Sequence, residues 1–197
     1  MFRLLWTPGS TLASALVAAP LILLTAAASA QPTPDGFLCC NMRTDGAWIS
    51  DSNYVDSSKR VIPVGTPVQV TGYGRYRVNV VIDGKKQDIG NDYSRNLDMG
   101  EFMQRYVVPR DPQRRIAGFA PPVQRAIREA KVRRGMSRDQ VLMAIGYPAH
   151  NYNPSLDARS WKYWLHRSGA FEVMFDRSGQ VSDVVAEPDV RAAVLVR

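Results

Sequence analysis

A helix whose two ends are both marked by residue type is the strongest local constraint in this sequence. Ser137 is a good N-cap, and Gln140 stands three residues later, where its side chain can return to the backbone N–H of the cap. Gly146 occupies the position of a helix-ending glycine, and Pro148 prevents the helix from continuing. The sequence therefore predicts a helix of about ten residues, which packs against a sheet and carries no catalytic motif.

An apolar stripe precedes this helix, and three alternating segments follow it. The stripe has the helical spacing i, i+3, i+4 and i+7 and consists of Val123, Ala126, Ile127 and Ala130. Residues 161–165, 171–175 and 180–185 alternate apolar and polar side chains and are separated by turn residues, as in an antiparallel meander. Two helices on one face of three strands would form an α+β sandwich in the order ααβββ.

This region resembles the SmpA/OmlA/BamE family of small envelope proteins, which support β-barrel insertion into the outer membrane. The resemblance covers about residues 123–185 and rests on Gly135-Met136-Ser137, Gln140-Val141, Gly146-Tyr147-Pro148, Trp161-x-Tyr163 and Val173-x-Phe175-Asp176-x-x-Gly179-x-Val181. It implies a non-catalytic ααβββ protein that binds partner proteins or anionic lipid. The chain differs from the family in having no lipid-attachment cysteine and in carrying a large additional N-terminal module. The predicted ααβββ fold also resembles that of secreted β-lactamase-inhibitor proteins, which usually contain two copies of it in tandem.

Short strand-like segments separated by turn residues dominate residues 37–89. Val68 and Val70 alternate with polar residues, and the same alternation recurs before Asp83-Gly84, which is a strong hairpin signal. Roughly five short strands of this kind predict a small β-barrel. The segments Asn41-Met42-Arg43, Val64-Gly65-Thr66-Pro67 and Asp83-Gly84 resemble those of bacterial Src-homology-3-like domains.

The expected fold class is therefore α+β, with an N-terminal Src-homology-3-like small β-barrel joined to a C-terminal ααβββ two-layer sandwich. The expected segments are a signal peptide at 1–30, the barrel with a following helix at 31–108, a linker at 109–120, the ααβββ domain at 121–187 and a tail at 188–197, for which a terminal helix after Pro188 is the alternative.

The beginning of the chain has the pattern of a secretory signal. Arg3 starts a short basic region, residues 12–28 are almost entirely apolar, and Ala28-Ser29-Ala30 forms a cleavage site. The apolar run is short for a membrane span. We therefore expect cleavage near Ala30–Gln31 and a periplasmic or secreted protein without a transmembrane helix in its mature form.

The charge balance is basic, with 25 Lys and Arg residues against 18 Asp and Glu residues. A basic exported protein is expected to meet an envelope protein, anionic lipid or an acidic polymer, and peripheral membrane contact is compatible with this charge. A solvated, arginine-rich surface explains the excess equally well. Residues 73–77 interleave tyrosine with arginine as nucleic-acid binders do, but export argues against nucleic acid as the partner.

Cys39 and Cys40 are the two cysteines of the chain, and they are neighbours. Their Cα atoms lie about 3.8 Å apart, below the usual disulfide window of about 4.4–6.8 Å, so a bridge between them would be strained. One interpretation is a buried cysteine beside a half-exposed one. A redox role and an intermolecular disulfide are the alternatives.

The sequence lacks the patterns that indicate catalysis. It has no Gly-x-Ser-x-Gly motif, no phosphate-binding glycine loop and no Cys-x-x-Cys motif. The two histidines, His150 and His166, have no metal-ligand spacing to the cysteines, so we expect neither a metal nor a cofactor. The aromatic side chains expected at a partner-binding surface are Tyr147, Tyr152 and Trp164.

These observations favour an exported, non-catalytic interaction protein of the cell envelope that docks a protein partner or an anionic membrane surface. A module that binds cell-wall polymer or peptide, and an inhibitor of a secreted enzyme, are the alternative functions. A thiol-redox enzyme at Cys39 and Cys40 is a further hypothesis.

Overall fold

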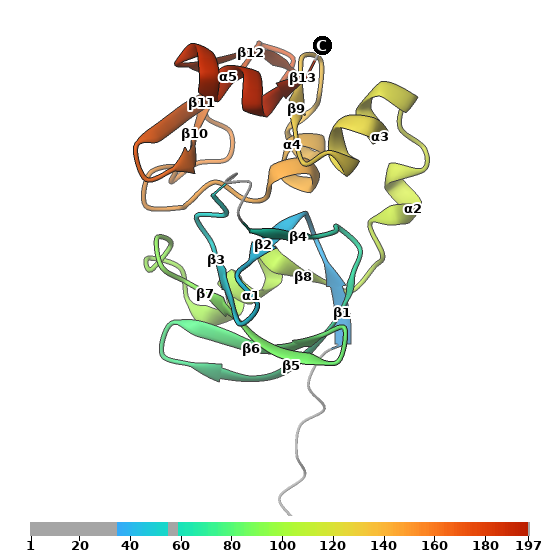
Figure 1. Ribbon diagram of the computed structural model, residues 1–197, viewed down its shortest axis with the longest axis vertical. Coiled ribbons are helices and arrows are strands. Elements are labelled where there is room, and N and C mark those ends of the chain that lie inside the picture. The colour runs from blue at the N-terminus through green and yellow to red at the C-terminus, as the bar shows by residue number, and fades with distance from the viewer. Residues whose placement is uncertain (1–34, 55–58, 197) are drawn as a thin grey trace, which may run out of the picture. The chain divides into compact units, whose positions relative to one another are not determined.

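The computed structural model describes residues 35–54 and 59–196 (Figure 1). The expected signal peptide and its cleavage site lie outside the described residues. The N-terminal part contains β1 (Asp35–Leu38), β2 (Met42–Thr44), β3 (Trp48–Ser50), β4 (Arg60–Ile62), β5 (Pro67–Gly74), β6 (Arg77–Ile82), β7 (Lys85–Gly90), α1 (Met99–Tyr106) and β8 (Val107–Val108). The C-terminal part contains α2 (Gln113–Ile116), α3 (Pro121–Arg128), β9 (Val132–Arg133), α4 (Arg138–Ile145), β10 (Ser160–His166), β11 (Gly169–Phe175), β12 (Val181–Ala186), α5 (Pro188–Val194) and β13 (Leu195–Val196).

An eight-stranded sheet organises the N-terminal part, in the order β4-β2-β3-β7-β6-β5-β1-β8. Its alternating residues point inward as the sequence predicts, since Val68, Val70 and Val80 are all buried. The predicted hairpin between β6 and β7 is confirmed. Asp83 and Gly84 both have positive φ, 51° and 72°, which a tight two-residue hairpin turn of type I′ requires.

Helix α1 completes the core of the N-terminal part, where a helix near residues 97–107 is predicted. Asp98 caps it by accepting hydrogen bonds from the N–H groups of Gly100 and Glu101, at 2.8 and 2.9 Å. Phe102 and Tyr106 project from its inner face into the apolar cluster of the sheet. The chain then leaves the helix directly into β8, which pairs with β1.

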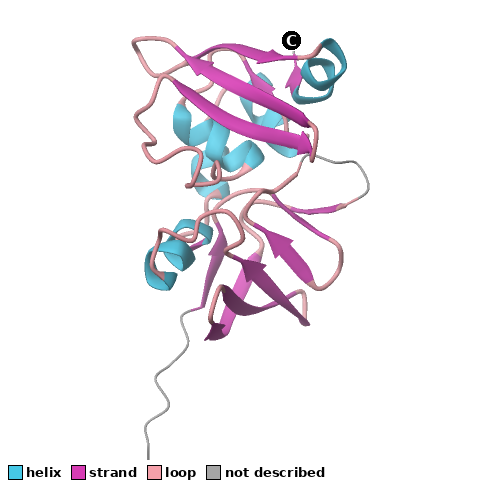
Figure 2. Cartoon of the chain, turned by 90° about the vertical axis from the view of Figure 1, so that its left-hand side faces the viewer, coloured by secondary structure: helices cyan, strands magenta, loops and turns pink. Residues whose placement is uncertain are grey.

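A three-stranded antiparallel sheet, β10-β11-β12, forms the frame of the C-terminal part (Figure 2). Trp161 and Tyr163 of β10 are buried in one cluster with residues of α3 and α4, so this face of the sheet is the core. Trp164 lies on the opposite face and is half-buried. The structure thus decides which tryptophan is structural, a question that strand periodicity alone leaves open.

Helix α4 confirms the predicted helix. The hydroxyl of Ser137 accepts from the N–H of Gln140, and the side chain of Gln140 accepts from the N–H of Ser137 at 2.9 Å, so the capping box is complete. Gly146 ends the helix with φ of 84°, a backbone conformation that favours glycine.

The predicted fold class is wrong. An eight-stranded sheet dominates the structure, and the C-terminal part is not an ααβββ two-layer sandwich. Val132–Arg133 pairs in parallel with Leu195–Val196, and α5 adds Val190 and Val194 to the core. Strands β9 and β13 are not predicted, because strands of two residues carry no alternation from which a prediction can start. Helix α5 lies in the segment that is predicted to be a tail or a terminal helix, and the structure shows the helix.

Within residues 35–54 and 59–196, no helix has both the length and the apolar character that crossing a membrane requires.

Candidate binding site

A cleft of about 640 Å³ opens between strands β1 and β8, the segment after β8, and helix α4. Phe37, Val108, Leu142 and Met143 supply an apolar floor. Phe37 and Val108 are cross-strand partners in the register of β1 and β8, which explains why they meet. The volume lies in the range of about 300–1,000 Å³ that is typical of ligand-binding pockets.

Arginine side chains from the segment after β8 form the rim of this cleft. Arg110 and Arg114 are exposed, and neither makes an ion pair with any other residue that the structure describes. Arg115 is paired with Asp139 of α4 at 2.8 Å, so its charge is already balanced. The cleft therefore combines an apolar floor with two guanidinium groups that are available to an anion.

Two further side chains fix the segment that carries these arginines. Asp111 accepts a hydrogen bond from the N–H of Gln113 at 2.9 Å, and the side-chain amide of Gln113 donates to the carbonyl of Val64 at 2.7 Å. Ile116 of α2 is buried in the C-terminal core. This segment lies within the predicted linker 109–120, and sequence reasoning did not recognise Arg110 and Arg114 as site residues.

Tyr147, a predicted partner-binding residue, lines the cleft. Its ring meets Tyr106 edge to face at 5.8 Å between centroids, and the guanidinium of Arg105 lies 5.5 Å from its centre. Burial raises the pKa of the Tyr147 hydroxyl, which keeps it protonated at neutral pH. It therefore offers the cleft a neutral hydroxyl and part of an aromatic ring.

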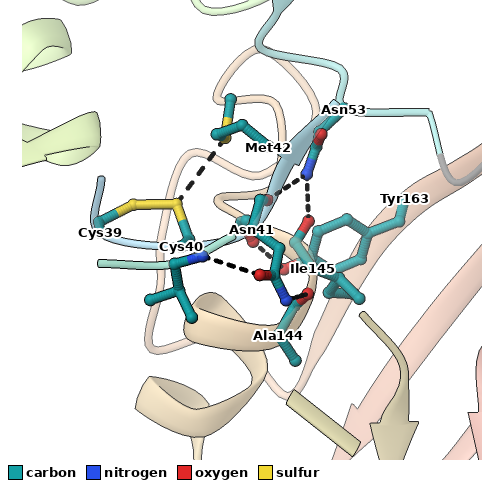
Figure 3. Close-up of a disulfide and its surroundings, with 10 residues drawn as sticks. Cys39, Cys40, Asn41, Met42, Asn53, Ala144, Ile145 and Tyr163 are labelled. Carbon is teal, nitrogen blue, oxygen red and sulfur yellow. Dashed lines mark hydrogen bonds between the residues drawn. A yellow bond between two sulfur atoms is a disulfide. The ribbon is translucent and has the colours of Figure 1, made fainter. Parts of the chain in front are cut away.

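Cys39 and Cys40 form a disulfide with each other beside the cleft (Figure 3). Cys39 is half-buried and lines the cleft, whereas Cys40 is fully buried with its sulfur 3.8 Å from that of Met42. In this oxidised form neither sulfur carries a thiol, so an intermolecular disulfide would first require reduction of this bond. The predicted redox role stays a hypothesis.

Two buried asparagines join the N-terminal part to the end of α4 (Figure 3). The amide of Asn41 donates to the carbonyls of Ile127 and Ala144, at 2.6 and 2.9 Å, and its side-chain oxygen accepts from the N–H of Val64. The amide of Asn53 donates to the carbonyl of Ile145 at 2.8 Å.

The last carbonyls of a helix have no partner within the helix. Here they receive N–H groups from residues about a hundred positions earlier in the chain. The backbone N–H of Asn41 donates to Met143, and the amide of Asn53 also donates to the carbonyl of Asn41 itself. We call Asn41 and Asn53 with these carbonyls the asparagine seam. It fixes the position of α4, which is one wall of the cleft, relative to β1 and β8.

Asp51 is a second buried polar group that the sequence did not reveal. Its carboxylate accepts from the N–H groups of Asp92 and Tyr93, each at 3.1 Å, and from the hydroxyl of Ser94. Burial raises the pKa of Asp51 to about 6, against the opposing effect of these hydrogen bonds. Ser94 in turn accepts from the backbone N–H of His150, so this loop also connects the two parts.

Tyr152 and Trp164, the other predicted partner-binding residues, lie together and do not line the cleft. Their rings meet at 4.7 Å between centroids with an angle of 61°. The structure therefore divides the three predicted side chains between two surfaces.

The two histidines make ordinary contacts: a ring nitrogen of His166 bonds to Ser168, and the backbone of His150 bonds to Ser94. Among the described residues, no group of three His, Cys, Asp or Glu side chains is placed to hold a metal ion. No protein-family model, curated protein or solved structure matches this chain.

Proposed function

We propose that this protein is a non-catalytic binding protein of the bacterial cell envelope and that its cleft holds a segment of a partner protein. The observation that carries the proposal is the pairing of an apolar floor with Arg110 and Arg114, whose charges no described residue balances. An apolar side chain of the partner would displace water from Phe37, Val108 and Leu142. An adjacent carboxylate would form charge-assisted hydrogen bonds with the arginines.

The acidic groups at the cleft support binding over catalysis. Asp139 is paired with Arg115, and Asp111 caps the turn at Gln113. Both acids are thus already committed to structural contacts, and burial raises the pKa of the Tyr147 hydroxyl, which moves it further from the range in which it could act as a base near neutral pH. The envelope location rests on the expected signal sequence. The fold that the family resemblance implies is not the observed one, so the resemblance does not support the proposal.

The test is binding of short fluorescent peptides to the full-length protein, measured by anisotropy. Peptides that alternate phenylalanine with glutamate should bind, and peptides that alternate phenylalanine with lysine should not. The double variant Arg110→Glu/Arg114→Glu should weaken the acidic peptide at least tenfold, an estimate of about 1.4 kcal/mol for lost charge-assisted contacts.

The matched control is Arg128→Glu/Arg177→Glu, which makes the same change of charge at two exposed arginines that do not line the cleft. It should leave the affinity within about twofold of wild type, since only screened long-range interactions change. Equal losses in the two double variants would refute the cleft as the site. Binding to phosphatidylglycerol vesicles without binding to either peptide would show that the ligand is a membrane surface and not a partner protein.

A further inference from the structure

Three of the four most exposed tyrosines of the described residues, Tyr76, Tyr93 and Tyr152, lie on segments that contact one another. The large apolar or aromatic side chains with the greatest exposure are Tyr73, Tyr76, Tyr93, Tyr152 and Val185, at 51, 36, 38, 54 and 59%. Four of these five are tyrosines. Exposed aromatic groups that gather in this way indicate a binding surface, whereas isolated ones need no explanation.

Contacts between neighbouring segments connect Tyr76, Tyr93 and Tyr152 with two further aromatic residues, Tyr54 and Trp164. The backbone N–H of Asn151 donates to the carbonyl of Tyr93 at 3.1 Å, so the segment that carries Tyr152 lies beside the segment that carries Tyr93. The pKa of Tyr54 is raised by burial first, and then by the neighbouring Tyr93 and Tyr152. Tyr152 packs on Trp164 of β10. At the other end, the backbone N–H of Asn91 donates to the carbonyl of Tyr76 at 2.9 Å, two residues before Tyr93. We call Tyr76, Tyr93, Tyr54, Tyr152 and Trp164 the aromatic track.

Cationic groups lie along this track. Two guanidiniums approach the ring of Tyr76: Arg75 at 5.2 Å and Arg95 at 4.7 Å from its centre. Lys59 lies 5.9 Å from the ring of Tyr54, and Lys162 lies 5.6 Å from that of Trp164. Arg167 is close enough to Tyr54 to favour its ionised form.

None of these five cations makes an ion pair with another described residue, although arginines elsewhere do, at Asp88, Asp139 and Asp183. Glu172 faces Lys162 across the register of β10 and β11 and forms no ion pair with it. Asp51 is buried below the loop of Tyr93, where two backbone N–H groups engage it. Two further acids lie near the track. Asp92 precedes Tyr93 and accepts hydrogen bonds from Trp48 and Ser50, and the pKa of Asp45 is lowered by backbone hydrogen bonds from Trp48 and Ala47 and then by the charge of Lys59. The track therefore carries more positive than negative charge along its aromatic rings.

We propose that the aromatic track binds an extended acidic polysaccharide. Sugar rings place their C–H faces on aromatic rings, and their carboxylates pair with Arg and Lys. Tyr152 is 54% exposed and Trp164 is half-buried, so both rings are accessible to a ligand at the surface. The hydroxyls of Tyr54 and Tyr93 add hydrogen-bonding groups between the rings. This mixture suits a hydroxyl-rich, non-planar chain better than stacked nucleic-acid bases, which need a succession of open ring faces.

The site is separate from the cleft, since none of the track residues lines the cleft. The proposal goes beyond the proposed function and does not depend on it.

The test is titration of the full-length protein with alginate oligomers, a polymer of uronic acids, followed by calorimetry. Arg75→Ala/Arg95→Ala should weaken alginate binding at least tenfold, because two charge-assisted contacts are lost. Tyr152→Ala should weaken it by several fold through loss of a stacking surface. The control Arg128→Ala/Arg177→Ala removes the same charge elsewhere and should change the affinity less than about twofold.

Three further outcomes decide the proposal. Neutral dextran should not bind, and Arg110→Glu/Arg114→Glu should bind alginate as wild type does. Trp164→Phe should still bind alginate while losing the fluorescence change that the wild type shows on titration, which places the ligand on the track. Tighter binding of oligothymidylate or of phosphatidylglycerol vesicles than of alginate, or equal losses in the track and control variants, would overturn it.

Discussion

The two parts of the molecule have apolar interiors, whereas the connection between them also contains buried polar groups. Trp161 and Phe171 belong to one apolar cluster, and Leu38 and Phe102 belong to the other. Between the clusters, Asn41 and Asn53 supply amide N–H groups to the end of α4. Apolar contacts depend little on direction, so they stabilise each part without fixing its register against the other. The buried amides are directional, and they specify one position for α4.

The comparison predicts that the asparagine seam is more sensitive to substitution than the apolar clusters. Asn41→Leu should lower the free energy of unfolding by at least about 3 kcal/mol, because three buried backbone groups lose their partners at about 1–3 kcal/mol each. Urea denaturation at neutral pH measures this loss. Ile127→Val, in the adjacent apolar cluster, is the reference and should cost about 1 kcal/mol. A smaller loss for Asn41→Leu than for Ile127→Val would contradict the comparison.

Asp51 is a carboxylic acid buried near the contact between the N-terminal and C-terminal parts, whereas the two apolar clusters contain no such acid. Its pKa in the folded protein is about 6, above the ordinary value of 3.8, so the folded state binds the proton more tightly than the unfolded state. The stabilising contribution is complete below about pH 4 and is lost as the pH rises through 6.

Asp51→Asn removes this titration. The stability of the variant relative to wild type should therefore rise by about 3 kcal/mol between pH 4 and pH 7, measured by urea denaturation at several pH values. The exposed variant Asp157→Asn should follow the wild-type profile. Parallel profiles for Asp51→Asn and wild type would show that Asp51 has no raised pKa.

A smaller loss of stability is expected at the first turn of α4 than at its last turn. Ser137 caps the first turn locally and remains partly accessible to water, whereas the last turn depends on distant asparagines. Ser137→Ala should lower stability by about 1 kcal/mol, and Ser137→Thr by less, because threonine retains a capping hydroxyl. Thermal denaturation is sufficient to measure both. A loss for Ser137→Ala equal to that for Asn41→Leu would remove the distinction between the two ends.

The smallest effect is expected at the surface ion pair between Arg115 and Asp139. The two side chains are 60 and 61% exposed, so solvent screens the attraction between their charges. Arg115→Ala should change the free energy of unfolding by less than about 1 kcal/mol, and the change should vanish at high salt. A loss above that of Ser137→Ala in denaturant titrations would show that the pair orders the rim of the cleft.

The parts of the fold that sequence predicts correctly depend on neighbouring residues. Ser137, Gln140 and Gly146 act within one helix, and Asp83-Gly84 acts within one hairpin. Their chemistry is complete inside a short window, so spacing alone reveals it. The same holds for the strand alternation of Val68 and Val70, which places both side chains in the core.

The features that sequence does not predict depend on distant partners. Asn41 lies 86 residues from Ile127 and 103 from Ala144, and its type gives no sign of either contact. The sequence indicates only a resemblance of the segment of Asn41 to a Src-homology-3-like motif, and no local pattern predicts the asparagine seam. Strands β9 and β13 are not predicted either, because two residues show no period. In the site, Tyr147 was a predicted residue, but the arginines beside it lie in a loop whose path no local pattern determines.

The exchange of side chains across the seam limits how this protein can be divided. Val64 of the N-terminal part is buried in the C-terminal cluster, and Tyr147 of the C-terminal part packs against the N-terminal cluster. Cutting the chain between the N-terminal and C-terminal parts would expose buried apolar surface on one fragment. It would leave the side-chain amides of Asn41 and Asn53 on the other fragment without their hydrogen-bond acceptors. Gene fusions and truncations that separate the two parts should therefore yield insoluble proteins. Insertions at the tip of the β6–β7 hairpin should be tolerated, because no other residue lies close to Gly84 there.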